Sequence, residues 1–237
     1  MKIQNKETLA FLGDIHGQFR RIGYLARQKN ITDAVIVQVG DFGIGYYKPN
    51  YYKTELSRVN DVLKERNIVL VAIRGNHDNP EYFKETHKPF DLENIWLLKD
   101  YEELTVCNKQ ILLVGGAQSI DRVDNVEGET YWRDEVINVK TPDEFDYKKY
   151  DIVVTHTALG MPYEEYKSSV LKYFLEKDKD LANDIKREQE QITNLYKYTT
   201  PRFWYHGHFH HSYSRVHEQT HFKGLEIDEI SEHFQYN

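Results

Sequence analysis

The 237-residue sequence has a single cysteine, Cys107, and no apolar run near the roughly 20 residues that a membrane-spanning helix needs. One cysteine excludes an internal disulfide and a cysteine-based metal cluster, so a metal site here must use carboxylate, imidazole and amide groups. The N-terminal stretch also lacks the apolar segment and small-residue cleavage site of a secretory signal. We therefore expect a cytoplasmic protein that does not associate with membranes.

The chain also lacks an excess of basic residues, and its formal net charge is −7. This charge argues against binding of extended nucleic acid, which needs a cationic face. A small phosphorylated substrate remains compatible with it, because bound metal ions make a pocket locally cationic. Apolar residues form 40% of the chain and charged residues 29%, which is typical of a folded globular protein.

Internal repeats, low-complexity tracts and Gly/Ser-rich linkers are absent, so we predict one domain over residues 1–237. In the first half, short aliphatic runs that end at glycines alternate with stretches of helical periodicity, which predicts an α/β fold with buried parallel strands. The predicted strands are Leu9–Leu12, Ala34–Val39, Val69–Ile73, Ile111–Val114, Ile152–Val154, Phe203–Tyr205 and a last one near Leu225–Ile230, and the first two predicted helices are Phe19–Gln28 and Lys53–Arg66.

Residues 163–198 have no glycine or proline and many Glu and Lys residues, with apolar residues at helical spacing. This pattern predicts one or two amphipathic helices inserted between two strands. The insertion begins shortly after His156 and ends shortly before His208. It is therefore either a lid over a site at these residues or a hairpin packed on the outer face of a sheet.

Five short polar segments follow predicted strands, and five of the eleven histidines lie in them. Ligands of open α/β sheets bind beyond the carboxyl ends of the strands, so the five segments are expected to converge on one crevice. Each motif alone is a weak signal, but the ordered set indicates a metal centre. The segments are Gly13-Asp14-Ile15-His16-Gly17, Gly40-Asp41, Gly75-Asn76-His77-Asp78, Thr155-His156 and Gly207-His208-Phe209-His210.

These motifs, in this order, resemble those of the calcineurin-like metallophosphoesterases, and most closely the small bacterial and phage members. The resemblance implies two mixed β-sheets packed as a sandwich and flanked by helices. It also implies a first metal held by Asp14, His16 and His210, and a second held by Asn76, His156 and His208. Asp41 would bridge the two, because a carboxylate can offer one oxygen to each cation.

The same resemblance implies that a metal-bridging hydroxide hydrolyses a phosphomonoester or phosphodiester. His77 would donate a proton to the leaving oxygen, with Asp78 orienting it from behind. The segment Gly115–Arg122 follows a strand and is a candidate to lie beside the metals, where Arg122 or Arg133 could hold a phosphate oxygen. Oxygen and nitrogen ligands suit Mn²⁺, Fe or Zn²⁺, and we favour Mn²⁺.

The sequence departs from the family where a second Asp or Asn usually follows the Gly-Asp motif, because Ile44 stands there. The Asp-Arg-Gly of the phosphoprotein phosphatases is also absent, which argues against that activity. Two alternative functions are a nuclease acting on nucleic-acid ends and a non-catalytic scaffold with the same fold. The tyrosines after Asp41 could stack a nucleobase or could simply cover the surface: they are Tyr46, Tyr47, Tyr51 and Tyr52.

Overall fold

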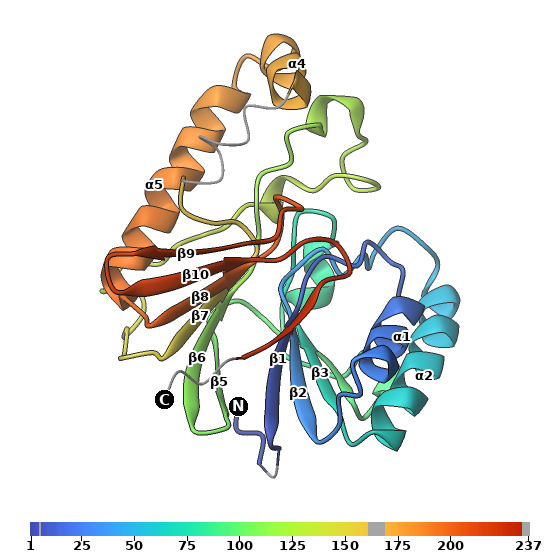
Figure 1. Ribbon diagram of the computed structural model, residues 1–237. Helices are drawn as coiled ribbons and strands as arrows, with labels where there is room; N and C mark the ends of the chain where they lie inside the picture. Colours follow the sequence, from blue (N-terminus) through green and yellow to red (C-terminus); the bar gives the residue numbers. More distant parts are fainter. Residues whose placement is uncertain (5, 161–168, 234–237) are drawn as a thin grey trace.

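The computed structural model describes residues 1–4, 6–160 and 169–233, which form two mixed β-sheets packed face to face (Figure 1). The predicted sandwich fold is confirmed. In the described residues the first sheet has the order β11 (Ile230–Glu232), β1 (Thr8–Leu12), β2 (Ala34–Gln38), β3 (Val69–Ala72) and β4 (Ile95–Leu97). The second has the order β5 (Glu102–Val106), β6 (Lys109–Val114), β7 (Ile152–Thr155), β8 (Phe203–His206), β10 (Thr220–Gly224) and β9 (Tyr213–His217).

Side chains of the first sheet alternate between two apolar cores, as expected for a strand with a period of two. In β1, Leu9 and Phe11 face the second sheet, whereas Ala10 and Leu12 face the helices. The helices on this side are α1 (Arg20–Gln28) and α2 (Pro49–Glu65), which cover the outer face of the sheet (Figure 1). Burial on both faces explains why these strands are continuous apolar runs in the sequence.

The predicted insertion contains two helices of different character. The longer, α5 (Leu181–Thr199), packs on the outer face of the second sheet, where Ile192 and Leu195 join Trp204 and Phe222 in a third core. The shorter, α4 (Ser169–Lys177), lies beyond the ends of the strands (Figure 1). Residues 161–168, where we expected the insertion to begin, lie outside the described residues. No helix in the described part of the chain is long and apolar enough to cross a membrane.

The strand predicted near Leu225–Ile230 is wrong, because most of this segment is the turn between β10 and β11. The backbone N–H of Glu226 donates to the Glu229 side chain at 2.9 Å, and Asp228 has a left-handed φ of +59°. The turn passes over Gly13, whose N–H donates to the carbonyl of Glu229 at 2.8 Å. A Cβ on Gly13 would collide with the carbonyl of Glu226, so glycine permits this crossing.

Candidate metal centre

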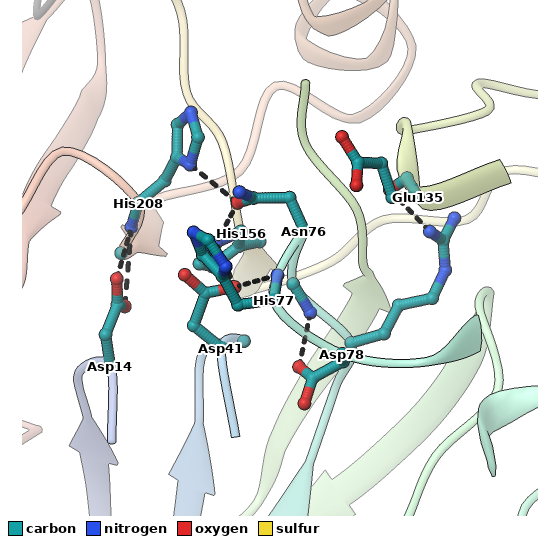
Figure 2. A network of polar contacts seen from close by, with 12 residues as sticks. Asp14, Asp41, Asn76, His77, Asp78, Glu135, His156 and His208 are labelled. Atoms are coloured by element: carbon teal, nitrogen blue, oxygen red, sulfur yellow. Dashed lines mark hydrogen bonds and ion pairs between the residues drawn. The ribbon is translucent and has the colours of Figure 1, made fainter. Parts of the chain in front are cut away.

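The candidate ligands lie in loops that follow β1, β2, β3, β7 and β8, at the carboxyl ends of parallel strands from both sheets. Because the two sheets pack face to face, these loops meet at one edge of the sandwich (Figure 2). The structure brings together all seven side chains that the motifs indicated: Asp14, His16, Asp41, Asn76, His156, His208 and His210.

A first group consists of Asp14, His16, Asp41 and His210, whose potential ligand atoms all lie within 4.8 Å of one another. His210 Nε2 is 3.0 Å from Asp14 Oδ2 and 3.1 Å from His16 Nε2. Both carboxylates are buried, whereas the two imidazoles reach the surface. Carboxylate oxygens and imidazole nitrogens at this spacing can hold one divalent cation.

A second group surrounds the amide oxygen of Asn76 (Figure 2). This Oδ1 atom lies 3.1 Å from His156 Nε2 and 2.9 Å from His208 Nδ1. Asp41 contacts both groups: its Oδ1 is 3.1 Å from His156 Nε2, and its Oδ2 is 3.7 Å from His16 Nε2. The two oxygens of a single carboxylate therefore face the two groups of nitrogen donors.

Hydrogen bonds behind the cluster select which atoms face it. His156 Nδ1 donates to the carbonyl of Val39 at 2.9 Å, which directs Nε2 toward the cluster. Asn76 Nδ2 donates to Ser119 Oγ at 3.0 Å, which directs Oδ1 toward the imidazoles. The sequence indicated the Gly115–Arg122 segment because it follows a strand. It did not indicate the role of Ser119, because the hydrogen bond to Asn76 joins two segments that are distant in the sequence.

The electrostatics of the cluster suit a cation. Burial opposes ionisation of Asp41, but the imidazoles of His156, His77 and His16 hold its pKa well below the ordinary range. Within the described residues, the ion-pair partners of Asp14 and Asp41 are imidazoles rather than Lys or Arg. Buried carboxylates without a permanent cationic partner fit a centre that a metal ion completes.

The backbone of the cluster is strained at four of the seven residues. His16, Asp41, His208 and His210 have φ values of +46°, +55°, +68° and +50°, in the left-handed region. Residues other than glycine rarely adopt this backbone conformation, and each one that does costs about 1–3 kcal/mol of stability. Such strain is often found at functional sites. These four residues lie in the loops after β1, β2 and β8, three of the five loops that converge on the cluster.

Glycines beside the ligands leave the space that the carboxylates occupy. A Cβ on Gly75 would collide with Asp41 Oδ1, and a Cβ on Gly207 would collide with Asp14 Oδ1. The glycines of the Gly-Asn-His-Asp and Gly-His-x-His motifs are thus required by close packing against the neighbouring ligand loop.

His77 lies beside the cluster (Figure 2) and is one of the residues that line the cavity next to it. Its backbone N–H donates to Asp41 Oδ1 at 2.8 Å, and its ring Nδ1 is 3.2 Å from the hydroxyl of Tyr46. Burial and the charge of Asp78 raise the pKa of Tyr46, so this hydroxyl stays protonated. When the Tyr46 hydroxyl donates a hydrogen bond to Nδ1, the single N–H of the neutral ring is on Nε2.

Asp78 differs from the prediction that it orients the ring of His77. Its carboxylate is buried and accepts backbone N–H bonds from Phe42, Gly43, Ile44 and Gly75 at 2.7–3.0 Å. These amides belong to two buried loops and need acceptors, which a carboxylate supplies. Asp78 therefore joins the Asp41 loop to the Asn76 loop, and Tyr46 contacts the His77 ring instead.

The two predicted phosphate-binding arginines have other partners. Arg122 forms ion pairs of 2.6 Å with Asp178 and Asp184, and Arg133 is 79% exposed and pairs with Glu127. Both line a separate cavity of about 950 Å³, whose lining residues include none of the seven candidate ligands. Both guanidinium groups form ion pairs with acidic side chains away from the cluster. The structure therefore does not support a role of Arg122 or Arg133 in binding phosphate at the cluster.

A cavity of about 280 Å³ opens directly beside the cluster. Its wall includes Val170, Leu171 and Phe174 of α4, so this helix lies over the candidate site. The two helices of the insertion thus take different positions: α4 borders the crevice, and α5 packs on the sheet. A lid function of α4 stays a prediction. Among the described residues, the lining consists of Asp41, Asn76, His77, Ile120, Asp121, Val170, Leu171, Phe174, His208, Phe209 and His210.

Fold and site together define an α/β sandwich protein with a candidate metal centre. The family model of calcineurin-like phosphoesterases matches residues 7–212, which include all seven candidate ligands. The chain belongs to this family and is a hydrolase that acts on phosphate ester bonds.

Solved structures share the fold at low sequence identity. The phosphopantetheinyl hydrolase of Mycobacterium tuberculosis is 13% identical, with a TM-score of 0.50 over 95% of this chain and 92% of that one. The protein TT1561 of Thermus thermophilus is 11% identical, with a TM-score of 0.50 over 96% of this chain and 99% of that one. No curated protein sequence matches the chain. These likenesses therefore extend to the fold alone.

Proposed function

We propose that the protein binds two divalent metal ions and hydrolyses a small phosphomonoester or phosphodiester. The observation that carries this proposal is the position of Asp41, whose Oδ1 and Oδ2 face two separate groups of nitrogen donors. The first ion would be held by Asp14, His16 and His210, the second by Asn76, His156 and His208, and Asp41 would be shared. The donor set contains oxygen and nitrogen but no thiolate, which suits Mn²⁺, Fe or Zn²⁺, and among these we favour Mn²⁺.

In this reaction a water oxygen forms a bond to phosphorus, the ester P–O bond breaks, and the leaving oxygen takes a proton. When bound, the metal ions supply a water of low pKa and neutralise charge on the phosphoryl oxygens. His77 stands on the cavity with Tyr46 at Nδ1, which supports its role as the proton donor to the leaving oxygen. The single cysteine, Cys107, fits a cytoplasmic location.

The test is substitution of the shared carboxylate. Asp41→Ala should lose measurable hydrolysis of both nitrophenyl phosphate and bis-nitrophenyl phosphate, and elemental analysis should show fewer metal ions per chain. Chelation should inactivate the native protein, and added Mn²⁺ should restore it. Asp61→Ala, an exposed change on α2, is the matched control and should retain activity and metal. Full activity of Asp41→Ala after exhaustive chelation would overturn the proposal.

A further inference from the structure

The residues that line the cavity at the metal centre form two chemically different sets. One is polar and consists of the candidate ligands and His77. The apolar part of the lining comes from three separate parts of the chain: the loop after β6, α4 and the loop after β8. Its residues are Ile120, Val170, Leu171, Phe174 and Phe209.

The described residues that line this cavity include acidic side chains but no Lys or Arg. One of the acidic side chains is that of Asp121. A second phosphate or a carboxylate on the substrate would therefore lack a cationic side chain in the described lining and would face Asp121. Repulsion of this kind selects against an anionic partner.

We propose that the substrate of this site is a small phosphate ester whose alcohol part is apolar and uncharged. This inference rests on the proposed function, because the phosphate is assigned to the metal ions. The carbon chain of the alcohol would then lie on Ile120, Leu171 and Phe174, where burial of apolar area favours binding. A hydroxyl or carboxylate placed against these three side chains would lose its water without gaining a partner.

The dimensions agree with a small substrate. Ligand cavities are commonly about 300–1,000 Å³, and this one, at about 280 Å³, lies at the lower limit. The ester oxygen would lie between the two sets of residues, next to His77. This volume accommodates a short alkyl or aryl group.

Phosphonates provide a test that does not depend on turnover, because their carbon–phosphorus bond is not hydrolysed. Calorimetry on Mn²⁺-loaded protein would compare hexylphosphonate, its analogue with a terminal hydroxyl, and its analogue with a terminal carboxylate. Hexylphosphonate should bind about tenfold more tightly than the hydroxyl analogue, and the carboxylate analogue should bind most weakly. Equal affinities for all three would overturn the inference.

Substitutions in two different elements test the apolar lining itself. Phe174→Ser on α4 and Ile120→Ser on the loop after β6 should each reduce the preference for hexylphosphonate to about twofold or less. Their affinity for inorganic phosphate should stay unchanged. Leu175→Ser is the control, because Leu175 is 37% exposed on the same helix and lies outside the cavity lining. An unchanged preference in Ile120→Ser and Phe174→Ser would contradict the proposal.

Hydrolysis of the two nitrophenyl esters by the same preparations separates this inference from the proposed function. If the protein hydrolyses the esters but binds the three phosphonates with equal affinity, only the inference about the alcohol group is overturned. Selective binding of hexylphosphonate without hydrolysis of either ester supports the apolar lining and overturns the proposed function.

Discussion

At the residue scale, hydrogen bonds to neighbouring groups decide which atoms of the site face the cavity. Val39 directs His156, Ser119 directs Asn76, and the Tyr46 hydroxyl meets the ring of His77. Such contacts hold a ligand or a proton donor in one orientation, so that little energy is lost in ordering it when substrate binds.

His77→Ala tests the proton donor. If His77 protonates the leaving oxygen, the variant should slow esters with poor leaving groups by about 10²–10⁴, and a nitrophenyl ester far less. The ratio of kcat/KM for an alkyl phosphate and nitrophenyl phosphate measures this, and metal content should not change. His87→Ala, at a histidine remote from the cavity lining, is the control. Equal losses on both esters would mean that His77 positions the phosphate instead.

Ser119→Ala tests the support behind Asn76. Without Oγ, the buried Asn76 amide loses its acceptor and can rotate, so metal affinity at the Asn76 group should fall by about tenfold. Metal titration followed by calorimetry should show one weakened binding step, with the step of the Asp14 group unchanged. Ser57→Ala on α2, where Ser57 Oγ binds only its own helix, should leave both steps unchanged. Equal weakening of both steps would contradict this role.

At the scale of elements, the two helices of the insertion have separate structural roles. Glu188 of α5 is buried and accepts from the backbone N–H of Gln118 at 2.6 Å and from Thr157 Oγ1 at 3.1 Å. It thereby joins the loop after β6 to the loop that carries His156. Deletion of the whole insertion would expose the sheet under Ile192 and Leu195, at roughly 1.5–3 kcal/mol for each lost side chain.

Replacement of α4 alone is therefore the sharper test of a lid. A Gly/Ser segment of equal length in place of Ser169–Lys177 keeps α5 and its core contacts. Metal binding should stay intact, while KM for small esters should rise or bulkier esters should be accepted, because one wall of the cavity is lost. The surface pair of Lys177 and Asp124 is also lost, with little effect on stability. Unchanged kinetic constants for small and bulky esters would show that α4 is not a lid.

At the scale of the whole molecule, the site joins the two sheets through buried polar groups. Arg74, after β3, pairs with Asp100 at 2.8 Å and donates to the carbonyls of Asp134, Glu135 and Val136. The side chain of Glu135 is buried, and its Oε1 accepts from the N–H of Ser119 at 2.7 Å. Its Oε2 has no hydrogen-bond partner among the described residues.

Glu135 makes stability depend on pH. Burial raises the pKa of Glu135 to about 8, whereas in the unfolded chain it is near 4.5. As the pH rises, the unfolded chain therefore loses this proton at a lower pH than the folded protein does. The free energy of unfolding should then fall as the pH rises from about 4.5 to 8. Glu135→Gln cannot ionise, so its stability relative to the native protein should increase across this window by on the order of 2–4 kcal/mol.

Urea unfolding of metal-free protein at several pH values between 5 and 8 would measure this difference. The comparison between variants cancels the titration of groups that both share. Glu129→Gln, at an exposed position of the same loop, should follow the native curve. Parallel curves for Glu135→Gln and the native protein would show that Glu135 does not carry the effect.

The sequence by itself determined the family, the sandwich fold and the set of residues that gather at the cluster. These features are local: an apolar run marks a buried strand, and the motif that follows it lies at the strand's carboxyl end. Once the strands are parallel, such ends must meet at one edge, so Asp14, Asp41 and His156 could be assigned to one site before their distances were known. Their roles as metal ligands remain predictions.

Only the tertiary structure decided which partners the other polar groups take. Asp78 accepts hydrogen bonds from backbone amides 34–36 positions away, and also from the amide of Gly75. Arg122 binds Asp178, which is 56 positions away. Neither pairing can be predicted from the local sequence. The turn after β10 depends on the close approach of Gly13 from the other end of the chain. The position of α4 at the cavity likewise brings its side chains next to loops that are distant in the sequence. Contacts between distant segments depend on the packing of the whole chain, because several partners of equal chemistry compete for each polar group.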